Sequence, residues 1–267
     1  MKPARLLVIA GSDSGGGAGI QADVKTASAF GVYAMTAITA VTVQNTVGVH
    51  GVHAVPAEIV RDQIRHCLDD IGADAIKIGM LGTADLIEAV SAVLAEKAKG
   101  IPLVLDPVML AKGGAPLLPN DAIENLKSKL VPLSRLVTPN LPEAEALTGI
   151  APTNADQARA AAEKIFALGA NAVLFKGGHG SGKTVLDILV EGNGNISVFA
   201  ADRQDTRHTH GTGCTLSSAI ACGLAEGVAL KDAVAHAHAY VQAAIKAAPG
   251  FGSGHGPLNH MVKLSDR

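Results

Sequence analysis

The chain has 267 residues, 48% of them hydrophobic, and its 22 basic and 24 acidic side chains leave a formal net charge of −2. This composition can fill a sizeable core, and the balanced charge argues against nucleic acid or an anionic membrane surface as the main partner. Cys67, Cys214 and Cys222 have neither paired nor metal-like spacing, and no segment approaches the roughly 18 apolar residues of a membrane span, so we expect a soluble cytoplasmic protein.

The first apolar run, residues 5–10, is too short for the hydrophobic part of a secretion signal and predicts a buried strand. Beyond it, short apolar runs alternate with longer alanine-rich segments of helical period. The expected strands are residues 5–10, 36–44, 75–79, 102–106, 135–139 and 172–176. The expected helices are residues 19–30, 57–71, 83–98, 120–130, 142–148, 155–168, 212–226 and 230–247. This alternation predicts a single domain over residues 1–267, with a mostly parallel sheet covered by helices on both faces.

Residues 177–184, GGHGSGKT, match the phosphate-binding pattern G-x-x-x-x-G-K-[ST] at every position. A working loop of this kind opens a helix, whose first amides hold the phosphates. The following residues, TVLDILVEGNGNISVFA, are rich in β-branched side chains and carry a turn signal at EGNGN. They predict two strands of a hairpin, so we interpret the match as accidental and Lys183 as a mobile loop lysine.

Two other glycine-rich segments precede predicted helices. Residues 10–23, AGSDSGGGAGIQAD, follow the first strand and either let a ligand approach the backbone or form a flexible loop. In residues 208–227, a Gly-Thr-Gly turn leads into an Ala/Leu helix, and successive amides at a helix start suit a phosphate. Cys214 falls in the first turn, where the dipole is expected to lower the thiol pKa; the alternative is a small buried cysteine.

Polar residues stand at or just beyond the ends of several predicted strands. They are Gln44, Asn45, Asp106, Asn140, Glu143 and Lys176. Each alone could cap a helix or lie in a solvated turn, but parallel strands bring their carboxyl ends to one edge of the sheet. Two carboxylates and an asparagine there suit Mg²⁺ with its waters and phosphate oxygens, and a lysine suits a polyphosphate.

Together these motifs resemble the hydroxymethylpyrimidine/phosphomethylpyrimidine kinases of thiamine biosynthesis, within the ribokinase-like superfamily. The matching segments are GSDSGGGAGIQADVKT, TAVTVQNT, KIGM, LDPVM, TPNLPEAE, KGGH, THGTGCTLSSAIA and GHGPLNH, spread over essentially the whole chain. The resemblance implies a three-layer α/β/α domain with a central, mostly parallel sheet. It implies phosphorylation of 4-amino-5-hydroxymethyl-2-methylpyrimidine on its hydroxymethyl oxygen, then of the monophosphate to the diphosphate, with ATP and Mg²⁺ each time. Homodimers are common in this family, and edge strands around residues 36–55 could contribute.

The resemblance also implies a binding site for the pyrimidine ring. Gln44 would hydrogen-bond the aminopyrimidine edge, and Thr42 should share its strand face by the period of two. The pocket around the ring would be formed by Gly11, Ala18, Thr42, Met80 and Val108. An aliphatic residue is the commoner occupant at Thr42, and Asp23 would have a neighbouring polar role.

A reaction centre at the start of the late helix is implied as well. Gly211, Thr212 and Gly213 would form the anion hole. Cys214 stands where ribokinase relatives carry a catalytic Asp, and it would be the base for the hydroxymethyl group. The second transfer would need no base, because a phosphate monoester is already an anionic nucleophile.

For the nucleotide, Asp106, Asn140 and Glu143 would organise Mg²⁺ and the phosphates, with Asp106 and Glu143 as the metal ligands. Lys176 would touch the ATP phosphates. Many relatives carry a lysine near the nucleotide in the last helix, where this chain has His238, whose charge is pH-dependent. The alternative for His238 is a solvated helix histidine.

Three competing functions fit parts of the sequence. Pyridoxal kinase shares the fold and much of the site, and some members accept both rings, although Met80 and Cys214 favour the pyrimidine. A P-loop NTPase would require residues 184–190 to be helical. A non-catalytic pyrimidine-binding protein would show no ATP turnover, and the intact Asp, Asn, Glu, Lys and GTGC set argues against it.

Overall fold

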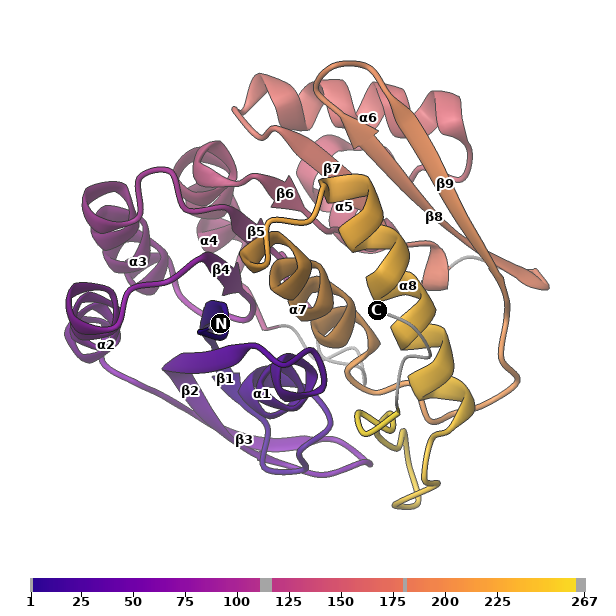
Figure 1. Ribbon diagram of the computed structural model, residues 1–267, viewed down its shortest axis with the longest axis horizontal. Helices are drawn as coiled ribbons and strands as arrows, with labels where there is room; N and C mark the ends of the chain where they lie inside the picture. The colour runs from indigo at the N-terminus through magenta and orange to yellow at the C-terminus, as the bar shows by residue number, and fades with distance from the viewer. Residues whose placement is uncertain (1, 111–116, 180–181, 263–267) are drawn as a thin grey trace.

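The computed structural model describes residues 2–110, 117–179 and 182–262, and these form a nine-stranded sheet in the order β3-β2-β1-β4-β5-β6-β7-β8-β9 (Figure 1). The strands are β1 (Arg5–Ser12), β2 (Tyr33–Gln44), β3 (Val49–Ala54), β4 (Ala75–Ile78), β5 (Leu103–Leu105), β6 (Leu136–Val137), β7 (Ala172–Phe175), β8 (Thr184–Glu191) and β9 (Ile196–Asp202). β1, β2 and β4 to β7 are parallel, whereas β3, β8 and β9 add antiparallel edges. The predicted mostly parallel sheet is confirmed.

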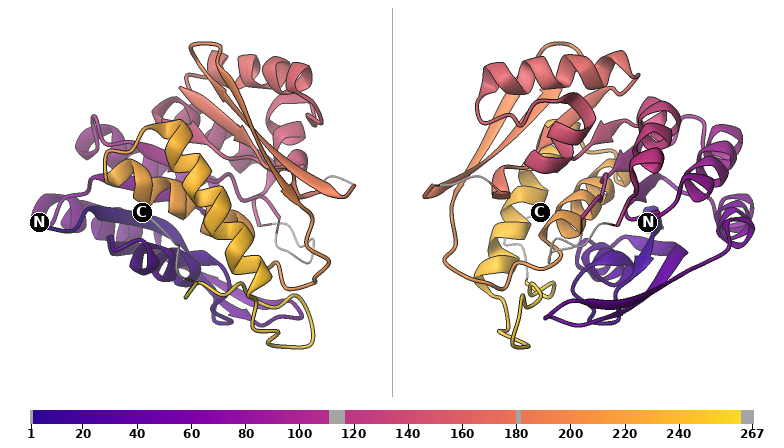
Figure 2. Two further views of the ribbon diagram at one scale, coloured as in Figure 1. Left: turned by 45° about the vertical axis from the view of Figure 1, so that its right-hand side comes forward. Right: turned by 180° about the vertical axis from the view of Figure 1, so that it is seen from behind.

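Helices cover both faces of the sheet (Figure 2). They are α1 (Gly19–Ala29), α2 (Ala57–Asp70), α3 (Ala84–Lys97), α4 (Asn120–Asn125), α5 (Leu141–Thr148), α6 (Ala155–Ala167), α7 (Thr212–Ala225) and α8 (Leu230–Lys246). The expected helix 120–130 is α4 followed by a π-helical turn, Leu126–Leu130. None of the helices in the described part of the chain combines the length and apolar character needed to cross a membrane.

Two apolar cores separate the layers, and they follow from the alternation of side chains along the buried strands. In β1, Leu7 and Ile9 point to the core that contains α2 to α6, whereas Leu6 and Val8 point to the core that contains α1, α7 and α8. All four side chains are fully buried. The three-layer α/β/α arrangement expected from the resemblance is therefore present.

β3 was not predicted as a separate strand. The chain reverses after β2 because the side chain of Asn45 accepts hydrogen bonds from the amides of Val47 (2.9 Å) and Gly48 (3.2 Å). The returning segment then pairs antiparallel with β2 along the edge of the sheet. Gly51, in the middle of residues 49–54, weakened the strand signal of this segment.

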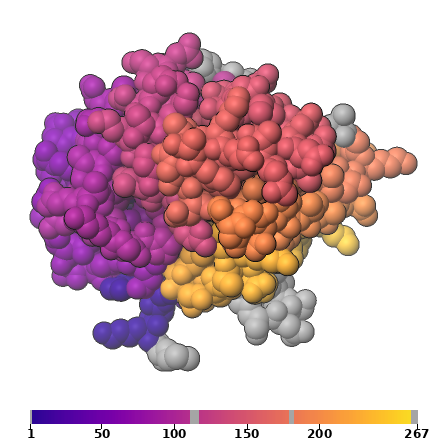
Figure 3. Space-filling view, turned by 90° about the horizontal axis from the view of Figure 1, so that it is seen from above, coloured from indigo at the N-terminus to yellow at the C-terminus, as the bar shows by residue number. Residues whose placement is uncertain are grey.

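The hairpin predicted after the GGHGSGKT segment is β8 and β9, and it projects from one end of the molecule (Figure 3). Thr184 is the first residue of β8, and Gly177 donates its amide hydrogen to Asp187 in that strand (2.9 Å). Residues 180–181 of the motif lie outside the described residues. Because a strand stands where a phosphate loop needs a helix, the P-loop NTPase alternative is wrong. Lys183 is exposed at the base of the hairpin.

Candidate active site

The glycine-rich loop after β1 is wound around the carboxylate of Asp13. Its Oδ1 accepts from the amide of Gly15 (2.8 Å), and its Oδ2 accepts from those of Gly17 (3.1 Å) and Ala18 (2.9 Å). His210 Nε2 lies 2.8 Å from the same Oδ2. Although burial raises the pKa of Asp13, the hydrogen bonds from His210 and the amides bring it below its usual value. The loop is thus held by an internal carboxylate.

The start of α7 packs directly against this loop. Gly211 is the N-cap residue, with a left-handed backbone (φ 85°), and a Cβ at this position would collide with the carbonyl of Gly17. Only glycine fits between the loop and the helix. The first amides of α7, which include those of Gly213 and Cys214, have no acceptor within the helix. They form the positive helix end that the sequence predicted for an anion.

Asp106 and Lys176 come together beside this turn, at the carboxyl edge of the sheet. Lys176 follows β7, and its Nζ donates to Oδ1 of Asp106, which follows β5 (2.6 Å). Thr138 also donates to Oδ1 (3.2 Å), and Ser217 of α7 donates to Oδ2 (3.4 Å). A Cβ placed on Gly213 would lie 3.2 Å from Lys176 Nζ and 3.7 Å from Asp106 Oδ2. The amide turn, the cation and the carboxylate therefore share one site.

Asn140 and Glu143 form a capping box at the start of α5. The Asn140 side chain accepts from the Glu143 amide (2.9 Å), and the Glu143 carboxylate accepts from the Asn140 amide (2.8 Å). Glu143 also lies 3.7 Å from Lys176 Nζ. Burial raises the pKa of Glu143 to about 6, with Lys176 opposing the rise. Burial lowers the pKa of Lys176, but Asp106 and Glu143 hold it above its usual range. Glu143 thus caps a helix and belongs to the charged cluster.

Cys214 lies in the first turn of α7, as predicted, and its side chain is half-buried. The expected lowering of its pKa is wrong for the protein without substrates, because burial raises the pKa of the thiol to about 11. The cation of Lys77 opposes this rise, the carboxylates of Asp23 and Asp106 add to it, and the amide of Gly19 opposes it. Burial and two nearby carboxylates outweigh the helix start.

Asp23 lies in the interior. It pairs with Lys77 of β4, whose Nζ is 2.9 Å from both carboxylate oxygens, and both side chains are 0% exposed. Ser218 of α7 donates to Asp23 Oδ1 (2.6 Å). Burial lowers the pKa of Lys77, yet the carboxylate of Asp23 raises it above its usual value overall. The charged pair therefore lies beneath the turn that carries Cys214, and the neighbouring polar role of Asp23 in ring binding stays a prediction.

Gln44 and Thr42 share one face of β2, as the period of two predicted. Thr42 Oγ1 and Gln44 Oε1 are 3.1 Å apart, and Gln44 Nε2 lies 3.4 Å from His210 Nε2. His210 links Gln44 to Asp13 and immediately precedes the turn of α7. Gln44, which is predicted to hydrogen-bond the pyrimidine ring, is therefore close to both glycine-rich segments.

The remaining predicted pocket residues lie at neighbouring strand ends. A Cβ placed on Gly11 would be 2.6 Å from the methyl carbon of Met80, so this flexible side chain fills the space that glycine leaves. Ala18, at the start of α1, and Val108, just beyond β5, are half-buried. Their contact with a ring stays a prediction.

His238 of α8 is buried, so the solvated alternative is wrong. Its Nε2 lies 3.8 Å from Asp187 Oδ2, and its ring centroid is 6.1 Å from that of Phe199. Asp187 in turn holds the amide of Gly177, the residue after Lys176. Asp187 therefore lies between His238 and the backbone that follows Lys176.

Sequence reasoning did not single out three polar residues of this region. Asp13 directly follows β1, so the search for polar residues at the ends of predicted strands could have found it. His210 directly precedes the Gly-Thr-Gly turn, and Lys77 interrupts the apolar run AIKIG. A lone lysine inside a buried strand indicates a buried carboxylate partner elsewhere in the chain.

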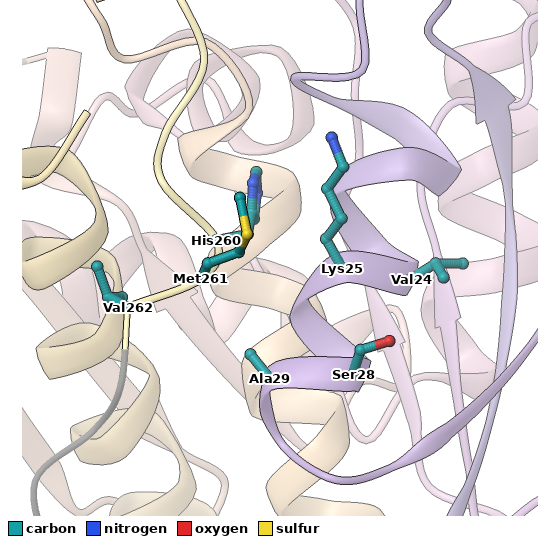
Figure 4. A pocket seen from close by; sticks show the side chains of 7 residues that line it. All are labelled: Val24, Lys25, Ser28, Ala29, His260, Met261 and Val262. Carbon is teal, nitrogen blue, oxygen red and sulfur yellow. The ribbon is translucent and has the colours of Figure 1, made fainter. Parts of the chain in front are cut away.

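A cavity of about 410 Å³ lies away from these residues, between α1 and residues 260–262 (Figure 4). It is lined by Val24, Lys25, Ser28, Ala29, His260, Met261 and Val262. The predicted site residues do not line it. The carboxyl edge of the sheet, with its charged cluster and amide turn, is the candidate active site.

The sequence matches the family described as Phosphomethylpyrimidine kinase over residues 13–259. A hydroxymethylpyrimidine/phosphomethylpyrimidine kinase of Streptomyces coelicolor is 47% identical over 264 residues, covering 99% of this chain and 97% of the relative. The thiamine biosynthesis bifunctional protein ThiED of Geobacter sulfurreducens is 48% identical over 98% of this chain. This chain spans about half (53%) of that bifunctional protein.

Solved structures agree with these matches. The ADP complex of Bacillus subtilis pyridoxal kinase has a TM-score of 0.88 and 38% identity, covering 97% of this chain and 98% of that one. Phosphomethylpyrimidine kinase from Clostridium difficile has a TM-score of 0.80 and 44% identity, covering 91% and 99%. The predicted ribokinase-like kinase fold and phosphotransferase class are confirmed. This chain belongs to the phosphomethylpyrimidine kinase family.

Proposed function

We propose that this enzyme transfers the γ-phosphoryl group of ATP to the hydroxymethyl oxygen of 4-amino-5-hydroxymethyl-2-methylpyrimidine, and then a second one to the phosphate of that product. The observation that carries the proposal is the position of the α7 turn, where Gly213 lies against both Lys176 and Asp106. The Streptomyces relative, a hydroxymethylpyrimidine/phosphomethylpyrimidine kinase, supports the same substrates. Both steps belong to thiamine diphosphate biosynthesis.

The site is suited to phosphoryl transfer because it stabilises charge and fixes geometry. Negative charge on the migrating group is met by the first amides of α7 and by the Lys176 ammonium group. In a loose transfer, positioning and charge stabilisation supply most of the catalysis. In the second reaction the substrate's phosphate is the nucleophile, and no base is needed.

Mg²⁺ bound with the nucleotide fits the charged cluster. Asp106 and Glu143 present carboxylate oxygens, the ligands that Mg²⁺ prefers, and both face Lys176 Nζ (2.6 and 3.7 Å). Mg²⁺ takes most of its ligands from water and substrate phosphates and needs only one or two protein carboxylates. Bound there, Mg²⁺ would neutralise phosphate charge.

We propose that Cys214 contacts the hydroxymethyl oxygen in the first reaction. With a pKa of about 11, only roughly one thiol in ten thousand is ionised at pH 7 in the free enzyme. A strong base is not required, because the proton of a primary alcohol leaves late in a loose transfer. The thiol therefore orients the alcohol and is a weak proton acceptor at most.

We also propose a cytoplasmic homodimer that pairs through the β2–β3 edge. Val41, Val43 and Val52 are 48%, 65% and 54% exposed on these two strands. An apolar strand surface of this kind favours association. Light scattering after size-exclusion chromatography measures the oligomeric state, and a monomer at micromolar concentration would remove this part of the proposal.

A second candidate function is phosphorylation of pyridoxal-type alcohols. It is favoured by the fold comparison, since the pyridoxal kinase of Bacillus subtilis has the higher TM-score, 0.88 against 0.80. Sequence identity favours the pyrimidine enzyme, 44% against 38%. The two rings are both flat heterocycles with a hydroxymethyl group.

Side-by-side transfer from ATP to the hydroxymethylpyrimidine, to its monophosphate and to pyridoxal tests both functions. We expect turnover of both pyrimidines, with the highest kcat/KM on one of them. Turnover of pyridoxal alone would replace the first function by the second. Turnover of the alcohol without the monophosphate would restrict the enzyme to the first step.

A further inference from the structure

His210 is enclosed on several sides and has little freedom to rotate. Its amide donates to Gly256 O (3.1 Å), and its side chain is 11% exposed. A Cβ placed on Gly17 would lie 2.6 Å from His210 Cδ2 and 3.2 Å from Pro257 Cβ. The imidazole is therefore packed between the loop after β1 and the C-terminal segment, with Nε2 facing two polar side chains.

The proton of this imidazole is on Nε2. Asp13 already accepts three backbone hydrogen bonds, and an ionised carboxylate can only accept. At 2.8 Å from Asp13 Oδ2, Nε2 must carry a hydrogen, because two lone pairs at this distance would repel each other. His210 donates its one Nε2 hydrogen to Asp13 and so turns an N–H group, not a lone pair, toward Gln44.

Thr42 presents an acceptor to the other end of the Gln44 amide. Its hydroxyl has one hydrogen, and the carbonyl of Ser12, at 2.9 Å, takes it in competition with Gln44 Oε1, at 3.1 Å. Gln44 therefore lies between an acceptor on Thr42, at 3.1 Å, and a donor on His210, at 3.4 Å. With Nε2 toward His210, two N–H groups face each other, and with Oε1 toward Thr42 the amide oxygen has a partner only when the hydroxyl hydrogen leaves Ser12. A half-turn of the amide brings Nε2 to the Thr42 oxygen and Oε1 to the N–H that His210 also donates to Asp13.

We propose that Asp13, His210 and Thr42 act as positioning residues that fix the Gln44 amide with Nε2 toward Thr42 and Oε1 toward His210, and that this orientation decides which way round the substrate ring binds. The inference rests on the proposed function. An aminopyrimidine edge offers a ring nitrogen as acceptor and the 4-amino group as donor, so an amide can pair with both.

The substituents next to these two atoms make the orientation important. The hydroxymethyl group is on the carbon next to the amino carbon, whereas the 2-methyl group is next to the ring nitrogen. When Gln44 Oε1 on the His210 side receives the amino group, the hydroxymethyl group lies on that side too. His210 immediately precedes Gly211 and the turn that carries Cys214. The opposite amide orientation would present the 2-methyl group to the turn.

Three variants test the kinetic consequence. His210→Leu removes the donor, His210→Gln keeps an N–H donor, and His260→Gln is a matched control because His260 is also buried beside α7 but bonds Thr215 (2.9 Å). In His210→Leu we expect kcat for the first phosphorylation to fall about tenfold, while the Kd for 4-amino-2,5-dimethylpyrimidine, which lacks the hydroxyl, changes less than about threefold. His210→Gln should regain most of kcat, and His260→Gln should resemble the unchanged enzyme. Equal losses of kcat and affinity, or no rescue by Gln, would overturn the proposal.

NMR of the unchanged full-length protein tests the arrangement without any activity. With ¹⁵N-labelled histidine and glutamine, we expect His210 to carry its proton on Nε2 and the Gln44 amide protons to show contacts to the Thr42 methyl group. A proton on Nδ1 alone, or amide contacts to the His210 ring instead, would refute the proposal even if the kinase assay succeeds. If instead the enzyme ignores both pyrimidines, the proposed function fails while this NMR result still stands.

Discussion

Two consecutive serines of α7 touch two different lysine–aspartate pairs. Ser218 donates to Asp23, whose partner Lys77 is 0% exposed and lies 2.9 Å from both carboxylate oxygens. Ser217 donates to Asp106, whose partner Lys176 keeps 11% of its side chain exposed. The first pair is closed from solvent. In the second pair, Lys176 lies at the sheet edge and faces a further carboxylate, that of Glu143.

This difference separates a structural pair from a pair that can exchange partners. Desolvating two charges is expensive, and a fully buried pair is tolerated only when its geometry and hydrogen bonds are complete. Lys77 and Asp23 meet that condition, so neither side chain has a position that a ligand could take. Lys176 can turn from a carboxylate to a phosphate oxygen, because it lies beside the amide turn at the open edge.

The largest expected effect comes from breaking the closed pair. Lys77→Met leaves the Asp23 carboxylate buried without its cation, which should lower the free energy of unfolding by about 3–5 kcal/mol. Urea denaturation measures this change. A matched control is Lys97→Met, because the surface pair of Lys97 and Asp69 is 28% and 47% exposed and should contribute only about 0–1 kcal/mol. Equal losses in both variants would remove the distinction between the pairs.

Lys176→Met should reverse the pattern, with a large loss of activity and a smaller loss of stability than Lys77→Met. Removing one charge that stabilises the migrating phosphoryl group should lower kcat/KM about 100-fold. Steady-state kinetics with each pyrimidine and urea denaturation of the same preparation give both numbers. Retained activity would show that Lys176 does not meet the phosphates.

How far the sequence predicts this molecule differs between its elements. The parallel strands follow from short apolar runs, and the flanking helices follow from longer segments of helical period. Because parallel strands bring their carboxyl ends to one edge of the sheet, the residues at those ends lead to Asp106 and Lys176. The pairing of Lys77 with Asp23 joins residues 54 positions apart, and no local pattern specifies it. The thiol pKa of Cys214 was mispredicted for the same reason, since it depends on burial and on carboxylates brought in by other elements.

Glu143 makes the open cluster sensitive to pH in the mildly acidic range. Its folded pKa of about 6 is above the ordinary value of 4.5, so the folded state binds a proton more tightly and loses stability as the pH rises from about 4.5 to about 6. A shift of this size corresponds to about 2 kcal/mol. Glu143→Gln keeps a capping side chain but does not titrate. Its stability relative to the unchanged protein should therefore rise by about 2 kcal/mol between pH 4 and pH 7, measured by urea denaturation. Parallel pH profiles would contradict the raised pKa.

Cys214 lies between the two pairs, and its removal should have the smallest and most selective effect. Cys214→Ala should lower kcat about tenfold with the alcohol and less than about threefold with the monophosphate, because only the alcohol needs orientation and help with its proton. Equal loss in both reactions would count against a direct contact with the hydroxymethyl oxygen.

Alkylation of Cys214 by iodoacetamide, followed by peptide mass spectrometry, gives an independent measurement of the thiol pKa. Since the thiolate reacts, the rate at Cys214 should rise about tenfold per pH unit from pH 7 to pH 10 without a plateau if its pKa is about 11. A plateau near pH 8 would mean that Lys77 and the helix start prevail over burial.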